Sequence, residues 1–311
     1  MTAEKHIPVL LKEVLTYLDC SNGGTYLDGT FGAGGYTKAI LNACSKNKVI
    51  SFDRDPNTIP TAEKLKQEFG DRFSFVHDCF GNLESYVQEP LDGLVLDLGV
   101  SSMQIDERER GFSFRFDGPL DMRMGQSGLS AKDVVNTYDE KTIADILFKY
   151  GEEKASRRIA RNIVQARKEK EIETTKELAD IIHQVMPKPK DGSDSAMRSF
   201  QALRIYVNDE LGELERALEA CKKVLKPEGR LVVVTFHSLE DRIVKNFLIQ
   251  NSDLKPNGNR HEISFIVPDE KPLFKVLTKK AVLPGKEELE FNSRSHSSKL
   301  RAGVFVAGEN E

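Results

Sequence analysis

The sequence predicts an α/β fold in which a parallel sheet, covered by helices, is interrupted by a helical insertion. Short apolar runs alternate with helical patterns over residues 1–100, and the runs are continuous, as in strands that are buried on both faces. A fifth run, Arg230–Phe236, follows only after residues 99–229, most of which have a helical pattern. We therefore expect a helical domain to be inserted after the fourth strand. The four earlier runs are Thr25–Leu27, Val49–Phe52, Phe73–Val76 and Leu91–Leu98.

We place the inserted domain at residues 107–205, and the sheet domain at residues 1–106 together with 206–311. The insertion is expected to open with an ordered loop, Arg110–Met124, because this glycine-containing segment has neither a helical nor a strand period. Two or three helices should follow this loop. A connection rich in proline and serine, Met186–Ser195, should end them.

Beyond that connection, apolar residues recur every three or four positions from Phe200 to Leu225. This spacing predicts one long amphipathic helix that returns the chain to the sheet, and Lys226–Gly229 should end it before the fifth strand. A coiled-coil segment is the alternative interpretation of the same spacing.

The composition is that of an ordinary globular protein. Of 311 residues, 39% are hydrophobic and 30% charged, and 45 basic against 49 acidic residues give a net charge of −4. This composition excludes a disordered or collagen-like chain. No apolar stretch is long enough to span a bilayer, and Met1–Leu15 lacks the apolar core of a secretory signal. We expect a cytoplasmic protein with four reduced cysteines, because no CxxC pair occurs.

A glycine-rich segment, Asp28–Gly35, follows the first strand and precedes a helical pattern, which is where a backbone can closely approach a nucleotide-like ligand. It lacks the Lys and Ser/Thr of a phosphate loop, and Thr37 stands where a dinucleotide fingerprint has its third glycine. The acidic Asp28 would repel a pyrophosphate but could bind the sulfonium or amino group of S-adenosylmethionine. A glycine-rich turn without a ligand is the alternative.

Three further residues follow strands two to four. Asp53 could accept both hydroxyls of a ribose, although Asp53–Pro56 is equally typical of a helix N-cap. Phe80 could stack on an adenine ring or belong to the core. Asp97 ends a strongly apolar run, where an unpaired carboxylate costs several kcal/mol, so some partner must satisfy it.

With these residues in place, the chain resembles the RsmH (MraW) family of S-adenosylmethionine-dependent methyltransferases, which methylate the N4 amine of a cytosine in the decoding region of 16S-type small-subunit ribosomal RNA. The resemblance covers about residues 6–301. It is carried by His6–Leu11, Asp28–Gly35, Asp53–Pro56, Leu96–Ser102, Glu109–Phe114, Gly118–Met124, Tyr150–Glu153, Phe200–Ile205 and Phe236–Ile243.

The resemblance implies a class I methyltransferase with a Rossmann-like sheet. It also implies S-adenosylmethionine as the cofactor and small-subunit ribosomal RNA as the partner, within an assembled or nearly assembled subunit, with a homodimer as one state of the enzyme and no role for a membrane. The family usually has His where this chain has Tyr36, so this contact is expected to use the backbone and the ring. The implied cofactor contacts are Gly34, Gly35, Tyr36, Asp53, Phe80, Asp97 and Gln104.

A basic stripe independently suggests contact with RNA. Six basic and no acidic residues lie between Lys154 and Lys168, and most of them share one face of the expected helix. A solvated helix face is the alternative. A second basic segment, Arg294–Arg301, lies in the serine-rich tail. The predicted RNA-binding residues are Lys154, Arg157, Arg158, Arg161 and Lys168.

The chemistry of N4 methylation requires alignment of the amine with the methyl group and sulfur, and an acceptor for an N4 hydrogen. The loop after the fourth strand lacks the two prolines and the aromatic residue that many amino-methyltransferases use, so the acceptor stays open among Asp97, Ser101, Ser102 and His237. The histidines form no HExxH or HxH pattern, so no zinc site is expected. A nicotinamide-dependent oxidoreductase and a catalytically silent RNA-binding protein are the competing classes.

Overall fold

A computed structural model describes residues 8–186, 194–254 and 272–306 of the chain. The chain divides into two compact units, which are treated separately below: Met1–Gly99 with Gly212–Glu311, called the sheet unit, and Val100–Leu211, called the helical unit. The sequence placed the insertion at 107–205, so the helical unit is a few residues longer at both ends.

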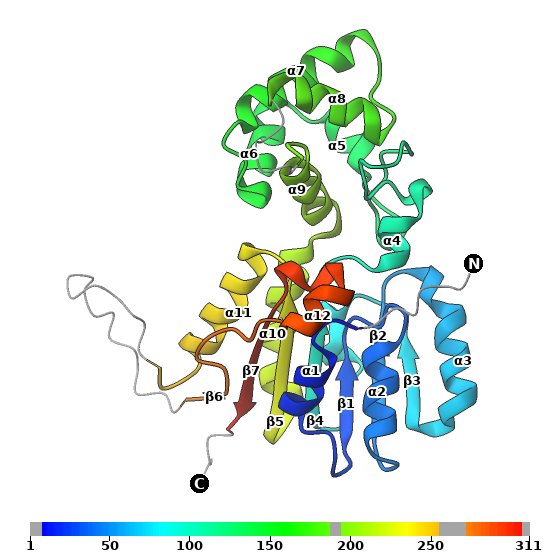
Figure 1. Cartoon of the computed structure of the whole chain (residues 1–311), viewed down its shortest axis with the longest axis vertical. Coiled ribbons are helices and arrows are strands. Elements are labelled where there is room, and N and C mark those ends of the chain that lie inside the picture. The colour runs from blue at the N-terminus through cyan, green and yellow to red at the C-terminus, as the bar shows by residue number, and fades with distance from the viewer. Residues whose placement is uncertain (1–7, 187–193, 255–271, 307–311) are drawn as a thin grey trace, which may run out of the picture. The chain divides into compact units, whose positions relative to one another are not determined.

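The sheet unit is built on seven strands in the order β3-β2-β1-β4-β5-β7-β6 (Figure 1). Strands β1 to β5 run parallel, and β7 pairs antiparallel with β5 and with β6. The strand order reverses between β1 and β4, which is the place where open α/β sheets bind ligands. The strands are β1 (Thr25–Asp28), β2 (Lys48–Phe52), β3 (Phe73–Val76), β4 (Leu91–Asp97), β5 (Leu225–Thr235), β6 (Phe274–Val276) and β7 (Lys299–Phe305).

The four apolar runs of the first hundred residues are confirmed as β1 to β4. The fifth strand differs, because β5 begins at Leu225, which pairs with Leu91 before a bulge, and not at Arg230. The antiparallel strands β6 and β7 were not predicted.

Helices cover both faces of the sheet, which explains why the strands are continuously apolar. Val95, Val232 and Val234 pack on one face against α1 (Leu11–Leu18), α2 (Gly35–Ala43) and α3 (Ile59–Phe69). Leu94, Leu96 and Val233 pack on the other face. That face is covered by α10 (Glu210–Val224) and α11 (Ser238–Gln250), and the short helix α12 (Lys286–Phe291) precedes β7.

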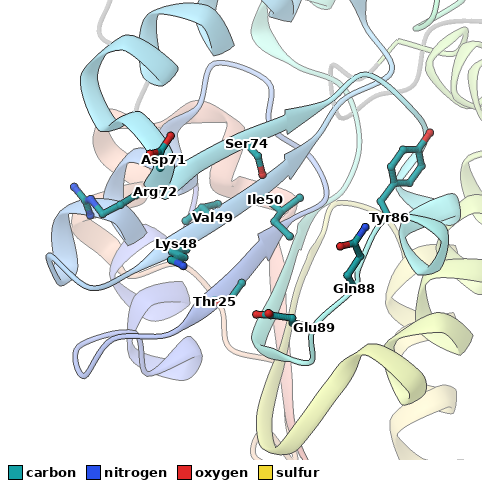
Figure 2. Close-up of a pocket in the computed structure, with 10 residues that line it drawn as sticks. All are labelled: Thr25, Lys48, Val49, Ile50, Asp71, Arg72, Ser74, Tyr86, Gln88 and Glu89. Carbon is teal, nitrogen blue, oxygen red and sulfur yellow. The ribbon is translucent and has the colours of Figure 1, made fainter.

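One face of the sheet is less completely covered near its β3 edge, because only the 3-10 helix η3 (Phe80–Ser85) and no α-helix connects β3 to β4. A cavity of about 240 Å³ opens there, lined among others by Lys48, Arg72, Tyr86 and Glu89 (Figure 2). Its lining includes residues at the amino ends of β1, β2 and β4, whereas the candidate site residues of the sheet unit follow the carboxyl ends of strands. This cavity is therefore separate from the predicted cofactor site.

The helical unit has its own apolar core, to which residues of five of its helices contribute. Four helices, and not two or three, lie between the loop and residue 186, and two of them begin with capping boxes, Ser130 with Asp133 and Thr174 with Glu177. The helices are α4 (Ser102–Asp106), α5 (Ala131–Thr137), α6 (Glu140–Gly151), α7 (Ser156–Glu169), α8 (Thr175–Val185) and α9 (Met197–Asn208).

The prediction of a single long helix over residues 200–225 is wrong. It is broken at Asp209, which has a left-handed backbone (φ 49°) and separates α9 from α10. The spacing of apolar residues continues across the break, so periodicity alone could not reveal it. The end of α10 at Val224 agrees with the predicted helix stop.

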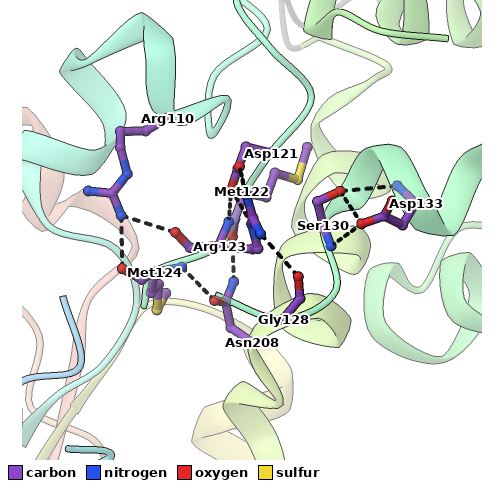
Figure 3. A network of polar contacts seen from close by, with 9 residues as sticks. All are labelled: Arg110, Asp121, Met122, Arg123, Met124, Gly128, Ser130, Asp133 and Asn208. Atoms are coloured by element: carbon purple, nitrogen blue, oxygen red, sulfur yellow. Dashed lines mark hydrogen bonds and ion pairs between the residues drawn. The ribbon is translucent and has the colours of Figure 1, made fainter. Parts of the chain in front are cut away.

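The loop that contains Arg110–Met124 is ordered by side chains, as predicted (Figure 3). Arg110 donates to the carbonyl oxygens of Arg123 (3.0 Å) and Met124 (2.9 Å). Asn208 of α9 accepts from the Met124 N–H (2.8 Å) and donates to the Met122 carbonyl (2.7 Å). Met122 is buried with a left-handed backbone (φ 62°), so these bonds hold a conformation that a non-glycine residue rarely adopts.

The basic tail is partly structural. Arg301 lies in β7, 8% exposed, and its guanidinium donates to Asp241 of α11 at 2.6 and 3.2 Å. Lys299 lies 3.4 Å from the same carboxylate. These two cations are therefore used within the sheet unit. In the described part of the chain, no helix is both long and apolar enough to cross a bilayer.

Candidate active site

The glycine-rich loop leaves the carboxyl end of β1 and enters α2. Asp28 is fully buried, and its carboxylate accepts from the Thr37 hydroxyl (2.7 Å) and the Thr30 N–H (3.1 Å). Burial raises the pKa of Asp28, and these hydrogen bonds partly offset the shift. The predicted contact between Asp28 and a cofactor cation therefore finds little support, because the side chain is buried and already bonded to Thr30 of the loop and Thr37 of α2.

Two glycines of this loop are needed for steric reasons. A Cβ at Gly29 would collide with Leu96 and crowd Phe80, so this turn passes directly beside β4 and η3. Gly34 has a left-handed backbone (φ 77°) and is the N-cap of α2, where a side chain would be strained. Gly35 begins α2, and Tyr36 follows it with a side chain that is only 3% exposed.

Asp53 lies just beyond β2 and is tied to the glycine-rich loop. One carboxylate oxygen accepts from the Gly32 N–H and the other from the Asp55 N–H, both at 2.8 Å. Asp55, and not Asp53, caps the following 3-10 helix, since its side chain accepts from the Asn57 N–H. The N-cap alternative is thus assigned to another residue. Burial raises the pKa of Asp53 to about 6.

Phe80 is half-buried at the start of η3 and packs against Gly29 and the apolar core. Its turn is held by Glu213 of α10, whose carboxylate accepts from the Gly81 N–H (2.9 Å) and from Arg216 (2.8 Å). Phe80 thus lies beside the loop with part of its surface exposed. This position is compatible with stacking on an adenine ring and with a role in the apolar core. Nothing in the sequence pattern had singled out Glu213.

Asp97 ends β4, next in the sheet to β1. Its backbone N–H donates to the Thr30 hydroxyl at 2.7 Å. Its side-chain Oδ1 is buried and has no hydrogen-bond partner among the described residues. Burial, followed by the nearby charges of Asp28 and Glu240, raises the pKa of Asp97 well above its usual range. The described residues therefore do not include the partner that the sequence required for this oxygen, as expected of a group that binds a ligand.

His237 follows β5 and is the N-cap of α11. Its Nδ1 accepts from the Glu240 N–H (3.4 Å), while the Glu240 carboxylate accepts from the backbone of Phe236 (2.8 Å) and of His237 (3.3 Å). Nε2 lies 3.1 Å from Glu240 Oε1, without the alignment of a hydrogen bond. Glu240 is buried, and its role was not predicted, although Glu three residues after an N-cap is the pattern of a capping box.

Ser101 and Gln104 belong to the helical unit and form another capping box. The Ser101 hydroxyl accepts from the Gln104 N–H (3.3 Å), and Gln104 Oε1 accepts from the Ser101 N–H (3.0 Å). The structure thus commits the Ser101 hydroxyl to the start of α4, which leaves it a poor candidate for catalysis. Ser102 is the first residue of α4, and its side chain lies outside the described part of the structure.

The predicted basic stripe lies on the exposed face of α7 and just before it. Arg161 lies 3.6 Å from Glu140 in an exposed ion pair, and Arg158 contacts the sulfur of Met186 at 3.8 Å. Arg167 differs, because it donates to the Val135 carbonyl (2.7 Å) and has a structural role. The exposed members are Lys154, Arg157, Arg158, Arg161 and Lys168.

The sheet unit thus places five of the predicted residues after the carboxyl ends of its parallel strands, with His237 after β5. The five are Gly34, Gly35, Asp53, Phe80 and Asp97. Gln104, Ser101 and Ser102 lie on the helical unit. Glu213, Glu240 and the hydrogen bonds of Thr37 were not predicted, since each acts through a neighbour and not through a motif.

Comparison with known proteins identifies the family. Residues 3–305 match the model of the MraW methylase family. The chain is 50% identical to the ribosomal RNA small subunit methyltransferase H of Rickettsia bellii over 307 residues, 97% of this chain and 99% of that protein. It is 53% identical to the protein of the same name from Methylorubrum extorquens, over 96% of this chain and 86% of that protein. A solved rRNA methylase from Streptococcus thermophilus covers 96% of this chain, and 94% of that chain is covered, with 12% identity and a TM-score of 0.41. The chain therefore belongs to the MraW methylase family.

Proposed function

We propose that this S-adenosylmethionine-dependent methylase transfers a methyl group to the N4 amine of a cytosine in the decoding region of small-subunit ribosomal RNA. The names of its relatives support the substrate class, because proteins about half identical to this chain over nearly their full length are called small-subunit rRNA methyltransferases. Family membership also favours methyl transfer over the two competing classes, an oxidoreductase and a silent RNA-binding protein.

The observation that supports the mechanism most strongly is the buried Oδ1 of Asp97, for which the described part of the chain supplies no hydrogen-bond partner. A carboxylate beside Asp28 and Glu240 favours a cationic or hydrogen-bond-donating ligand, since either would replace the missing partner. S-adenosylmethionine carries both a sulfonium and an ammonium group, and when bound it supplies an electrophilic methyl group. A cytosine amine supplies N–H donors.

The other residues at the carboxyl ends of the strands are assigned roles that match their geometry. Asp53 would accept the ribose hydroxyls, since its carboxylate lies between β2 and the glycine-rich loop. Phe80 would stack on the adenine. The backbone of Gly34, Gly35 and Tyr36 would contact the cofactor, and Gln104 would complete the contacts that the family resemblance implies.

For the N4 hydrogen we favour Asp97 as the acceptor. His237 Nδ1 is used as a helix cap, which leaves only Nε2, and this atom faces Glu240. Asp97 has a buried oxygen without a partner among the described residues, and it ends the strand at the switch point of the sheet. An accepted N4 hydrogen bond would localise the amine lone pair and disperse the developing positive charge.

We further propose that the exposed stripe of α7 binds phosphates of the RNA, that the substrate is an assembled or nearly assembled small subunit in the cytoplasm, and that a homodimer is one state of the enzyme. The stripe has few acidic neighbours in sequence and only weak, exposed contacts in the structure.

Two measurements test this function. Equilibrium binding should show micromolar affinity for S-adenosylhomocysteine and none for NAD; the reverse result would return the chain to the oxidoreductase class. Labelled methyl groups should pass from S-adenosylmethionine to small ribosomal subunits and not to large ones. Cofactor binding without transfer to any RNA would instead support a silent binding protein.

A further inference from the structure

An N-terminal segment, Pro8–Leu10, lies against the start of the glycine-rich helix α2 within the sheet unit. The hydroxyl of Tyr36 donates a hydrogen bond to the Val9 carbonyl. A Cβ at Gly35 would collide with the ring of Pro8, so this ring rests directly on the Gly35 backbone. The segment therefore covers the part of the loop where the cofactor backbone contacts are expected.

The same segment is held from its other side by α12. The Leu10 N–H donates to Glu288 Oε1 at 2.8 Å, and Leu10 has a left-handed backbone (φ 53°) as the N-cap of α1. The Val9 and Leu10 side chains are buried, 6% and 0% exposed. Leu10 has no side-chain cap, so Glu288 supplies an acceptor near the start of this helix.

The Tyr36 hydroxyl remains a donor throughout the physiological range. Burial, together with the charges of Asp97, Asp28 and Glu288, raises the pKa of Tyr36 well above its usual value. Its side chain is 3% exposed and its hydroxyl is bonded to Val9, so the hydroxyl acts on the site through the segment that it holds.

We propose that Tyr36 and Glu288 are positioning residues, which clasp Pro8–Leu10 over the glycine-rich loop so that the segment slows the escape of bound cofactor. This inference rests on the proposed function, because it assumes that S-adenosylmethionine binds at this loop. It assigns to the side chain of Tyr36 a role apart from cofactor contact, and it gives α12 a function in a reaction to which it contributes no other predicted residue.

The test compares Tyr36→Phe and Glu288→Ala with the wild-type enzyme in stopped-flow binding of S-adenosylhomocysteine. Each loses one hydrogen bond to the segment, so each should raise the dissociation rate, and hence Kd, roughly 3- to 10-fold. In Glu288→Ala, which lies outside the predicted cofactor contacts, kcat at saturating cofactor should be unchanged. The matched control is Tyr206→Phe. It removes a part-buried hydrogen bond from the Tyr206 hydroxyl to that of Tyr138 in the helical unit, and it should leave the rate of cofactor dissociation unchanged.

A double variant separates this role from a general loss of stability. Once one clasp is open, loss of the other should matter less, so the double variant should dissociate more slowly than the product of the two single effects predicts. Leu10 amide exchange should quicken in both single variants. Unchanged dissociation in Glu288→Ala, even if Tyr36→Phe fails to fold, or fully multiplicative effects, would overturn the inference. If the wild-type chain binds no S-adenosylhomocysteine, the proposed function itself fails.

Discussion

At the scale of single residues, the site is built from carboxylates that the fold treats differently. Asp28 is fully bonded inside the protein, Asp53 is tied to two backbone N–H groups, and Asp97 keeps one buried oxygen without a partner among the described residues. All three lie at the carboxyl ends of strands of one sheet, so sequence position alone could not distinguish their roles. The distinction comes from burial and hydrogen bonding, which only the structure shows.

Asp53→Ala should weaken cofactor binding by about 1.5 to 3 kcal/mol, because two ribose hydroxyls lose a charged acceptor. Isothermal titration with S-adenosylhomocysteine measures the effect. Asp53→Asn is the companion variant, since it keeps one acceptor oxygen for the Gly32 or Asp55 N–H. An unchanged dissociation constant in both variants would remove Asp53 from the site.

The pKa of Asp53 predicts how binding depends on pH. It is raised to about 6 in the free protein, whereas hydroxyl donors favour the ionised carboxylate, so binding should lower it. Cofactor affinity should therefore rise as the pH increases through about 6 and level off above this range. Because the pKa of Asp53 is higher in the folded protein than in the unfolded chain, Asp53 stabilises the fold at low pH. This contribution to the free energy of unfolding is lost as the pH rises from the pKa of the unfolded chain to about 6. Asp53→Asn should flatten the affinity profile; an equally steep profile in that variant would assign the titration to another group.

Gly34→Val should impair the protein through backbone strain. A Cβ at Gly34 would lie 3.1 to 3.2 Å from Phe31 and Leu65, and φ is 77°, so the new side chain would meet the protein itself and not only the space of a ligand. We expect a loss of about 1 to 3 kcal/mol of stability together with loss of cofactor binding. Thermal unfolding and titration measure both. Normal cofactor binding by this variant would show that the loop is not the cofactor site.

At the scale of elements, α7 is amphipathic in the way that the sequence predicted, with Ile159, Ala160 and Ile163 buried and the stripe exposed. One of the five cations of α7, Arg167, serves the fold, since it donates a hydrogen bond to a carbonyl of α5. An exposed cation without a strong partner contributes little to stability, so the remaining stripe is available for phosphates.

Arg157→Gln combined with Arg161→Gln should weaken RNA binding and reduce its salt dependence by roughly 0.7 to 0.9 units of log-log slope for each lost phosphate contact. Cofactor affinity should stay the same, because α7 contains none of the predicted cofactor contacts. Filter binding over a series of salt concentrations measures the slope. Lys176→Gln, on α8 and paired with Asp180, is the control. If the double variant keeps the wild-type slope, the exposed side of α7 is a solvated helix face that does not bind RNA phosphates.

At the scale of the whole molecule, the sequence predicted the fold class and the first four strands, because continuous apolar runs report burial on both faces directly. It missed the break at Asp209, since apolar spacing continues through a single left-handed residue. It also missed β6 and β7, and it read two structural cations of β7, Lys299 and Arg301, as part of a basic tail, since pairing with Asp241 is a long-range contact. The sequence singled out residues within motifs. It did not single out the residues that hold those motifs in place, such as Glu213 and Glu240.

The measurement that tests the central claim most directly is the identity of the methylated nucleoside. Small ribosomal subunits that lack the modification would be incubated with the enzyme and labelled S-adenosylmethionine, and the RNA would be digested and separated by chromatography. We predict that the label appears in N4-methylated cytidine from the decoding region, and that Asp97→Asn greatly reduces it. Label in another base, or a rate unchanged by Asp97→Asn, would contradict the account.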